Sequence, residues 1–169
     1  MAGFVPGRAG RGAAELDLAQ HKSWHNYLGT VLRMSTLLNR ELTDCHQLSL
    51  ADVRLLDLLE HAPTGSVQMG NLAEALASLP SRLTRQIKRL EDRGLVLREV
   101  SPHDRRCVVA TITDMGRTLV GQAMITYANV VRTHFLGPLT RPQIAAMAGT
   151  CRQIGDALKR PGRSGTSGP

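Results

Sequence analysis

The chain has 169 residues, of which 42% are hydrophobic, and this suits one domain with a substantial core, alone or with an extension. The formal charge of +7 favours an anionic partner, although net charge says nothing about the fold. No apolar run reaches the roughly 18 residues of a membrane span, and the start lacks the apolar core of a secretory signal. We therefore expect a cytoplasmic protein with no membrane partner.

The first part of the chain divides into a tail and a helix. Residues 1–14 are rich in Gly, Arg and Ala without periodicity, which is typical of a flexible tail. From about Leu16 to Leu42, apolar residues recur at helical spacing and predict one long amphipathic helix. Cys45 and His46 are then expected in a loop before the second helix.

Two shorter helices are predicted next. Ser49, with Asp52 three residues later, is typical of a helix N-cap, and the apolar residues that follow predict a helix that stops before Pro63. Met69 to Leu76 predicts a short third helix. A tight turn then leads into a more basic segment.

A basic helix is predicted from about Pro80 to Arg93. Ser78 is expected to cap this helix, and Pro80 suits its first turn because an N–H is not needed there. Gly94 is expected to end the helix, since glycine readily adopts the left-handed conformation after a last turn. The short helix over Met69 to Leu76, the turn after it and the basic helix therefore predict a helix-turn-helix.

The outer face of the basic helix is cationic. If Leu83 faces the core and each residue adds a rotation of 100°, then Ile87 and Leu90 also face the core. The residues that turn outward are Ser81, Arg82, Arg85, Lys88 and Arg89. Between residues 81 and 106 there are eight Lys or Arg against four Asp or Glu, as expected of a surface that binds phosphates.

The rest of the chain predicts a hairpin and two long helices. Residues 95–97 and 107–112 are β-prone and flank the polar segment SPHDRR, which predicts a hairpin with a basic tip. Thr113 is expected to cap a helix that reaches Phe135. Thr140 and Gln143 predict a capping box for the last helix, whose apolar stripe, including Cys151 as a core residue, should pack on other helices.

This order predicts a mainly α protein with a small β-hairpin wing, a winged helix-turn-helix flanked by long dimerisation helices. The predicted parts are a flexible basic tail over residues 1–14, a helical arm over 15–47, a DNA-binding lobe over 48–113, C-terminal dimerisation helices over 114–159 and a second flexible tail over 160–169.

The proposed partner of the lobe is double-stranded DNA. The N-terminal part of the second helix of a helix-turn-helix faces base edges, so Ser81, Arg82 and Gln86 are the candidates for readout, with Arg82 able to pair with guanine. Thr84, Arg85, Lys88 and Arg89 are expected to contact phosphates. Ser78 and Pro80, at the start of the helix, are also included in the predicted DNA-binding surface. A solvated cationic helix is the simpler interpretation of these charges, but the turn, the glycine stop and the basic hairpin together favour DNA.

The hairpin tip carries the second group of predicted DNA contacts, His103, Asp104, Arg105 and Arg106. An arginine at this tip has the reach to enter an adjacent minor groove, where it senses groove width more than base identity. Asp104 lies between basic neighbours and is expected to orient one of these arginines.

Three segments carry a family resemblance: LEDRGLV at residues 90–96, DRR at 104–106 and ITDMGR at 112–117. Together they resemble the MarR family of bacterial regulators. The resemblance implies a homodimer with interlocked first and last helices, a pseudo-palindromic operator, a nucleoid-associated repressor and Asp104 with Arg106 as the wing pair. It also implies relief of repression by a small molecule, often an aromatic acid. Arg82, Pro80 and Cys107 depart from the residues common in the family, so the operator sequence cannot be carried over.

The first helix contains the predicted effector pocket, formed by Trp24, His25, Tyr27 and Leu28. A tryptophan beside a histidine suits an aromatic acid, although Trp24 and Tyr27 also suit an ordinary dimer core. His21 and His25 have a spacing that can chelate a metal, but no third ligand completes the set. We therefore expect no metal and no cofactor.

Cys45 leaves a further alternative open, a redox-responsive regulator, because it lies beside His46 in a predicted loop. A ligand-independent architectural or activating DNA-binding protein is another, supported by the basic tails. An enzyme such as a thiol peroxidase is not favoured, because no nucleophile, base and orienting group occur at a recognisable spacing.

Overall fold

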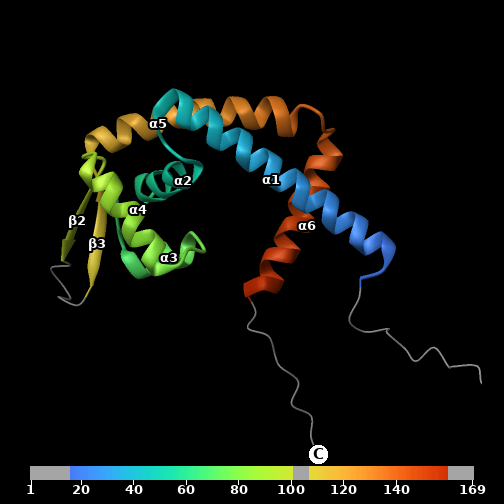
Figure 1. Cartoon of the computed structure of the whole chain (residues 1–169), viewed down its shortest axis with the longest axis horizontal. Helices are drawn as coiled ribbons and strands as arrows, with labels where there is room; N and C mark the ends of the chain where they lie inside the picture. The colour runs from blue at the N-terminus through green and yellow to red at the C-terminus, as the bar shows by residue number, and fades with distance from the viewer. Residues whose placement is uncertain (1–15, 101–106, 160–169) are drawn as a thin grey trace, which may run out of the picture. The chain divides into compact units, whose positions relative to one another are not determined.

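The computed structural model describes residues 16–100 and 107–159. The chain divides into two compact units, residues 1–36 and residues 37–169, and each is described by itself. Helix α1 (Leu18–His46) belongs to both, because the division falls between Thr36 and Leu37 (Figure 1). No helix of the described part of the chain is long and apolar enough to cross a membrane.

The second unit contains the other elements, and it is mostly helical with one small sheet (Figure 1). In chain order they are α2 (Leu50–Glu60), β1 (Ser66–Gln68), α3 (Met69–Ala75), α4 (Pro80–Asp92), β2 (Val96–Val100), β3 (Val108–Ile112), α5 (Asp114–Val131), the π-helical turn η1 (Arg132–Leu136) and α6 (Arg141–Lys159). The predicted fold class, a winged helix-turn-helix between long helices, is confirmed.

Helix α2 begins at the capping box that the sequence predicts. The Ser49 side chain accepts a hydrogen bond from the Asp52 backbone N–H, and the Asp52 carboxylate accepts one from the Ser49 N–H at 2.9 Å. These bonds satisfy donors that a helix N-terminus otherwise leaves without partners. The same residues return below as part of the candidate site.

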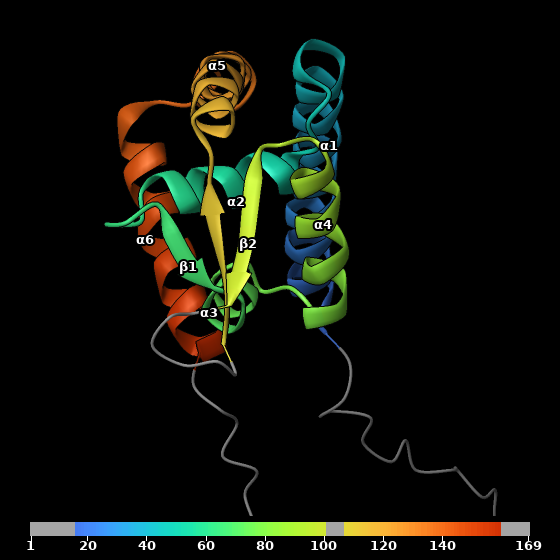
Figure 2. The same cartoon turned by 90° about the vertical axis from the view of Figure 1, so that its left-hand side faces the viewer.

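The sheet has three antiparallel strands in the order β1-β3-β2, with β3 in the middle (Figure 2). Strands β2 and β3 form the predicted hairpin, with Val96 opposite Ile112 and Val100 opposite Val108. Strand β1 was not predicted. It has only three residues, and it is held by pairing with β3 over a register that puts Val67 opposite Ala110.

One apolar core lies beneath the sheet and the three short helices. Helices α2, α3 and α4, the strands β2 and β3, and α5 all contribute fully buried side chains to it. Its buried members include Leu42, Leu48, Leu55, Leu56, Leu59, Leu72, Leu83, Ile87, Leu90, Val96, Ala110, Ile112 and Val120. Because Leu83, Ile87 and Leu90 are all among them, the predicted inner face of the basic helix is confirmed.

Helix α5 starts at Thr113, as predicted, and this residue also touches the end of α4. The Thr113 hydroxyl accepts a hydrogen bond from the Gly116 N–H at 3.0 Å and donates one to the Gly94 carbonyl oxygen at 2.7 Å. We expect Thr113→Ala to lower the free energy of unfolding by about 1–2 kcal/mol. Urea denaturation measures this change.

The matched control is Thr118→Ala, because the exposed Thr118 hydroxyl donates only to the Asp114 carbonyl of its own helix. This variant should match the wild type within about 0.5 kcal/mol. Equal midpoints for the two variants would show that the Thr113 cap adds nothing to stability.

The C-terminal helices differ from the prediction in two respects. Helix α5 ends at Val131, and a π-helical turn carries the chain on to Leu136. The predicted capping box of α6 forms only in part, because Gln143 Oε1 accepts from both the Thr140 N–H and the Thr140 hydroxyl, each at 2.9 Å. The Thr140 hydroxyl therefore acts as a donor and not as the expected acceptor.

The prediction that Cys151 is a core residue is wrong for the single chain. None of the residues of α6 is buried, and Cys151 is exposed on it. The apolar stripe of α6 exists as predicted, but no described element covers it. Burial needs a partner surface as well as a periodic stripe, and only the stripe is encoded locally.

Candidate nucleic-acid interface

Helix α4 follows α3 after a tight turn in which two consecutive backbone N–H groups are hydrogen-bonded back to α3. Ala77 adopts a left-handed conformation with φ 48°, and its N–H and that of Ser78 donate to the Glu74 and Ala73 carbonyl oxygens at 3.0 and 2.9 Å. This pair of hydrogen bonds ends α3 and reverses the direction of the chain. These two hydrogen bonds hold the turn against the end of α3, directly before α4 begins.

The predicted capping role of Ser78 is wrong. The N-cap of α4 is Leu79, whose side chain makes no capping bond, while the Ser78 hydroxyl reaches only the Leu79 carbonyl oxygen at 3.5 Å. The reason is Pro80, because a residue before proline is driven to extended backbone, which is the conformation of an N-cap. Pro80 itself occupies the first turn of α4, as expected.

The outer face of α4 presents three cations without a partner in the described part of the chain, Arg82, Arg85 and Lys88. All three are exposed, and no hydrogen bond or ion pair joins them to any described residue. Ser81 and Thr84 are exposed between them, and the Thr84 hydroxyl donates to the Pro80 carbonyl at 2.9 Å. The predicted one-sided charge of this helix is confirmed.

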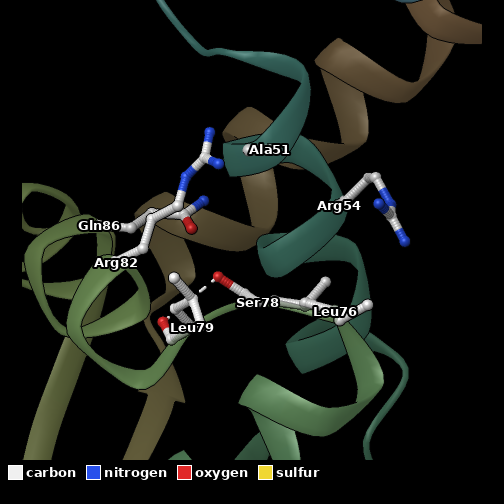
Figure 3. Close-up of a pocket in the computed structure, with 8 residues that line it drawn as sticks. Ala51, Arg54, Leu76, Ser78, Leu79, Arg82 and Gln86 are labelled. Atoms are coloured by element: carbon white, nitrogen blue, oxygen red, sulfur yellow. Dashed lines mark hydrogen bonds between the residues drawn. The ribbon is translucent and has the colours of Figure 1, made fainter.

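Arg82 lies between α4 and the start of α2. Figure 3 shows Arg82 beside Gln86 on α4, facing Ala51 of α2, with Arg54 on the other side of the pocket. The floor of this pocket comes from the α3–α4 turn, including Leu76. The guanidinium of Arg82 is thus exposed at the surface and borders an open pocket into which it can turn.

Two other polar residues of α4 contact a buried carboxylate, which the sequence did not indicate. The Gln86 amide donates to Asp52 Oδ1 at 3.0 Å, and an Arg89 Nη donates to the same oxygen and forms an ion pair with it. The Asp52 side chain is only 3% exposed, whereas that of Arg89 is 57% exposed. We call Asp52, Ser49, Gln86 and Arg89 the Asp52 cluster.

A second contact fixes the C-terminal end of α4. An Arg93 Nη donates to the Gln47 carbonyl oxygen at 2.8 Å, and Gln47 has left-handed backbone with φ 55°. Gly94, with φ 71°, ends the helix as predicted, because glycine adopts this conformation without strain. Helix α4 is therefore held at its middle and at its end against the junction of α1 and α2.

The predicted wing contacts belong to a segment outside the described part of the chain. His103, Asp104, Arg105 and Arg106 lie outside the described residues, between the paired ends of β2 and β3 at Val100 and Val108. Cys107 is half-buried directly after them. The hairpin that carries the tip is confirmed, and the role of the tip stays a prediction.

The residues predicted to form an effector pocket lie on the part of α1 that belongs to the first unit. Trp24 and Tyr27 have ring centroids 6.0 Å apart and are 53% and 49% exposed, while Leu28 is 38% exposed and His25 is also exposed. His21 and His25 are stacked with ring centroids 6.4 Å apart. Among the residues 16–100 and 107–159, no three His, Cys, Asp or Glu side chains form a metal-binding group.

A mixed pocket that the sequence did not indicate lies between α2, the end of α3 and α5. Its volume is about 510 Å³, and its walls combine the polar side chains of Arg54, Asp57 and His61 with apolar surface from Leu58, Met124 and Tyr127. The Asp57 carbonyl oxygen, 2.8 Å from His61 Nδ1, and then the Asp57 carboxylate raise the pKa of His61. The lining comes from three helices, so no local pattern could have revealed it.

Cys45 lies in the last turn of α1, so the prediction that it belongs to a loop is wrong. The helix continues to His46, whose ring nitrogen is 2.8 Å from the Thr126 hydroxyl of α5. This tertiary bond holds the last helical turn in place. Cys45 is exposed there.

The described elements define the class of the protein: a helix-turn-helix of α3 and α4, followed by an antiparallel hairpin, which is a winged helix-turn-helix. The comparison with known families is specific, because residues 48–108 match the model of the MarR family. This segment covers the turn, the basic helix and most of the hairpin. Over these residues the chain is similar to the MarR family.

Known relatives agree with this fold. The chain is 33% identical over 73 residues to the uncharacterized HTH-type transcriptional regulator YdgJ of Bacillus subtilis (strain 168), a match that spans 43% of each chain. The solved structure of Sco3205, a MarR family transcriptional regulator from Streptomyces coelicolor in complex with DNA, is 26% identical, with a TM-score of 0.83. It matches 92% of this chain and 97% of its own. AbsC, a MarR family regulator from the same organism, is 25% identical with a TM-score of 0.80, over 86% of this chain and 97% of its own.

Proposed function

We propose that this chain is a transcriptional regulator that binds double-stranded DNA in a sequence-specific manner, as a homodimeric repressor. The observation that carries the proposal is the outer face of α4, where Arg82, Arg85 and Lys88 are exposed and without a partner in the described chain. Their helix is backed by the fully buried Leu83, Ile87 and Leu90. A rigid cationic helix of this kind fits the major groove.

The roles on α4 follow from position and chemistry. Ser81 and Arg82 lie in the first turns and are assigned to base edges, with the planar fork of Arg82 suited to guanine. Arg85 and Lys88 are assigned to phosphates, which fix register without reporting sequence. The wing residues 103–106 are assigned to the adjacent minor groove, on the charge of their sequence alone.

The dimer is supported by apolar side chains that the single chain leaves exposed on its long helices. On α1, Trp24, Val31 and Leu32 are 53%, 41% and 58% exposed, and on α6 Ile154 and Leu158 are 47% and 81% exposed. Large apolar side chains in such stripes are typical of surfaces that pair with another chain. Sedimentation equilibrium of the full chain should give twice the monomer mass.

The proposed function is tested by selection from a pool of randomised duplexes, followed by footprinting on the selected sequence. We expect a pseudo-palindrome with half-sites about one helical turn apart, and an affinity that falls steeply with salt. Broad protection without a discrete palindrome would favour the ligand-independent architectural role. No binding to any duplex would contradict DNA binding itself.

A response to a small organic acid is a second proposal, favoured by the pocket of Arg54, His61 and Tyr127. The guanidinium of Arg54 beside apolar surface suits an aromatic carboxylate, while Asp57 is engaged by His61. We expect Arg54→Ala to weaken binding of 4-hydroxybenzoate about tenfold or more, because a bond to a charged group is lost. Isothermal titration calorimetry measures this affinity.

The matched control for the pocket is Arg152→Ala, which removes an exposed arginine of α6. This variant should bind 4-hydroxybenzoate as tightly as the wild type. Equal weakening in both variants would mean that the acid responds to overall charge and has no site at Arg54.

A further inference from the structure

The Asp52 cluster joins two elements that have different tasks in the proposed function. Asp52 Oδ2 accepts from the Ser49 N–H at 2.9 Å and from the Ser49 hydroxyl at 2.7 Å, both at the start of α2. Asp52 Oδ1 accepts from Gln86 and Arg89, both on α4. One carboxylate therefore receives four hydrogen bonds and is closed off from solvent.

Capping of α2 does not require the negative charge of Asp52. Glutamine is as suitable as an acid at this position of a capping box, because only an acceptor oxygen is needed. The charge is matched instead by Arg89, which pairs with the buried carboxylate. If Arg89 moved away to bind a phosphate, the buried Asp52 carboxylate would lose its counter-charge. The free-energy cost of this unpaired charge is larger than the gain from one exposed contact with a phosphate.

We propose that Asp52 is a specificity-determining positioning residue, which retains Gln86 and Arg89 against α2 and leaves Arg82, Arg85 and Lys88 as the cations that α4 offers to DNA. This inference rests on the proposed DNA-binding function. It withdraws two residues from the DNA contacts that the sequence predicts, Gln86 from base readout and Arg89 from phosphate binding. The reading face of α4 is then shorter and less charged than its sequence indicates.

The consequence is restraint on binding to random DNA. Binding without sequence preference comes from phosphate neutralisation, and each phosphate contact adds about 0.9 to the slope of log affinity against log salt. An Arg89 whose charge is balanced by Asp52 adds little to that slope. Asp52 thereby favours discrimination over total affinity.

The test measures this salt slope for the full chain on a random-sequence duplex and on the duplex that the wild type selects. Asp52→Asn keeps the shape and removes the charge. We expect it to steepen the slope on random DNA by about 0.9 for each subunit and to raise affinity there several-fold at low salt. The ratio of selected to random affinity should fall, and Asp52→Asn/Arg89→Gln should restore the wild-type slope.

Two further variants keep the proposal testable if Asp52→Asn does not fold, as judged by circular dichroism. Lys88→Gln should lower the slope on random DNA by about 0.9 for each subunit, whereas Arg89→Gln should leave it near the wild-type value. Equal falls for the two variants would overturn the inference, as would an unchanged slope in a folded Asp52→Asn. A wild type that binds neither duplex would overturn the proposed function as well, so the two failures are distinguishable.

Discussion

Gly116→Ala should strongly destabilise the protein, because the methyl group that it adds to α5 meets closely packed atoms. A Cβ at Gly116 would overlap the Leu95 carbonyl oxygen, would lie 3.2 Å from the Leu95 carbonyl carbon and would approach Ile112 Cγ1 to 2.8 Å. The Leu95 carbonyl cannot move away freely, because it accepts the Thr113 N–H at 3.1 Å. We expect a loss of about 2–3 kcal/mol in the free energy of unfolding, or roughly 4–12 °C in Tm.

Gly121→Ala is the matched control in the same helix. Beyond the neighbouring residues and the backbone of α5 itself, no atom of the described residues lies within 4 Å of a Cβ built there, so the new methyl group meets open space. Alanine in a helix interior is favoured over glycine by about 0.5–1 kcal/mol, and this variant should therefore be as stable as the wild type or more so. Thermal and urea denaturation of both variants would refute the close-packing argument if their stabilities fell together.

Arg82→Ala should change what the protein recognises more than how tightly it holds DNA. Arg82 has no partner in the described chain and lies in the first turns of α4, where base edges are within reach. A good bidentate contact with guanine contributes about 1–3 kcal/mol of discrimination. We expect the ratio of affinities for the selected and random duplexes to fall roughly 5- to 150-fold.

Lys88→Ala is the comparison for Arg82. Lys88 is an exposed cation of the same helix that is assigned to a phosphate, so its loss should weaken binding to both duplexes by a similar factor. Fluorescence anisotropy at fixed salt gives both ratios. Arg82→Ala would lose its assigned role in readout if it behaved as Lys88→Ala does.

The sequence predicts best those features that depend on local spacing. The buried side of α4, the capping box of α2 and the Thr113 cap of α5 all come from residues spaced three or four positions apart, and a single glycine ends α4. Such features are set by the period of the helix and by the free N–H groups at its start. These local features therefore do not depend on contacts with distant segments of the chain.

Features that join distant segments could not be predicted in this way. Asp52 is 34 residues before Gln86 and 37 before Arg89, so its second role is invisible in the pattern that marks it as a capping residue. Strand β1 is three residues long and depends on a partner more than 40 residues away. Ser78 does not cap α4 for a local reason, because Pro80 drives the preceding Leu79 into the extended backbone of an N-cap.

The bond between Thr113 and Gly94 has a consequence for signalling. Thr113, which directly follows β3 and caps α5, donates from its hydroxyl to the Gly94 carbonyl oxygen and from its N–H to the Leu95 carbonyl oxygen, so a tilt of α5 is coupled to the end of α4 and to the hairpin. We therefore expect a movement of α5 to rotate the whole predicted DNA-binding lobe as a rigid body. In the proposed dimer, we expect such a turn to alter the distance between the two lobes, so that regulation would act on their spacing along the operator while each lobe keeps its shape.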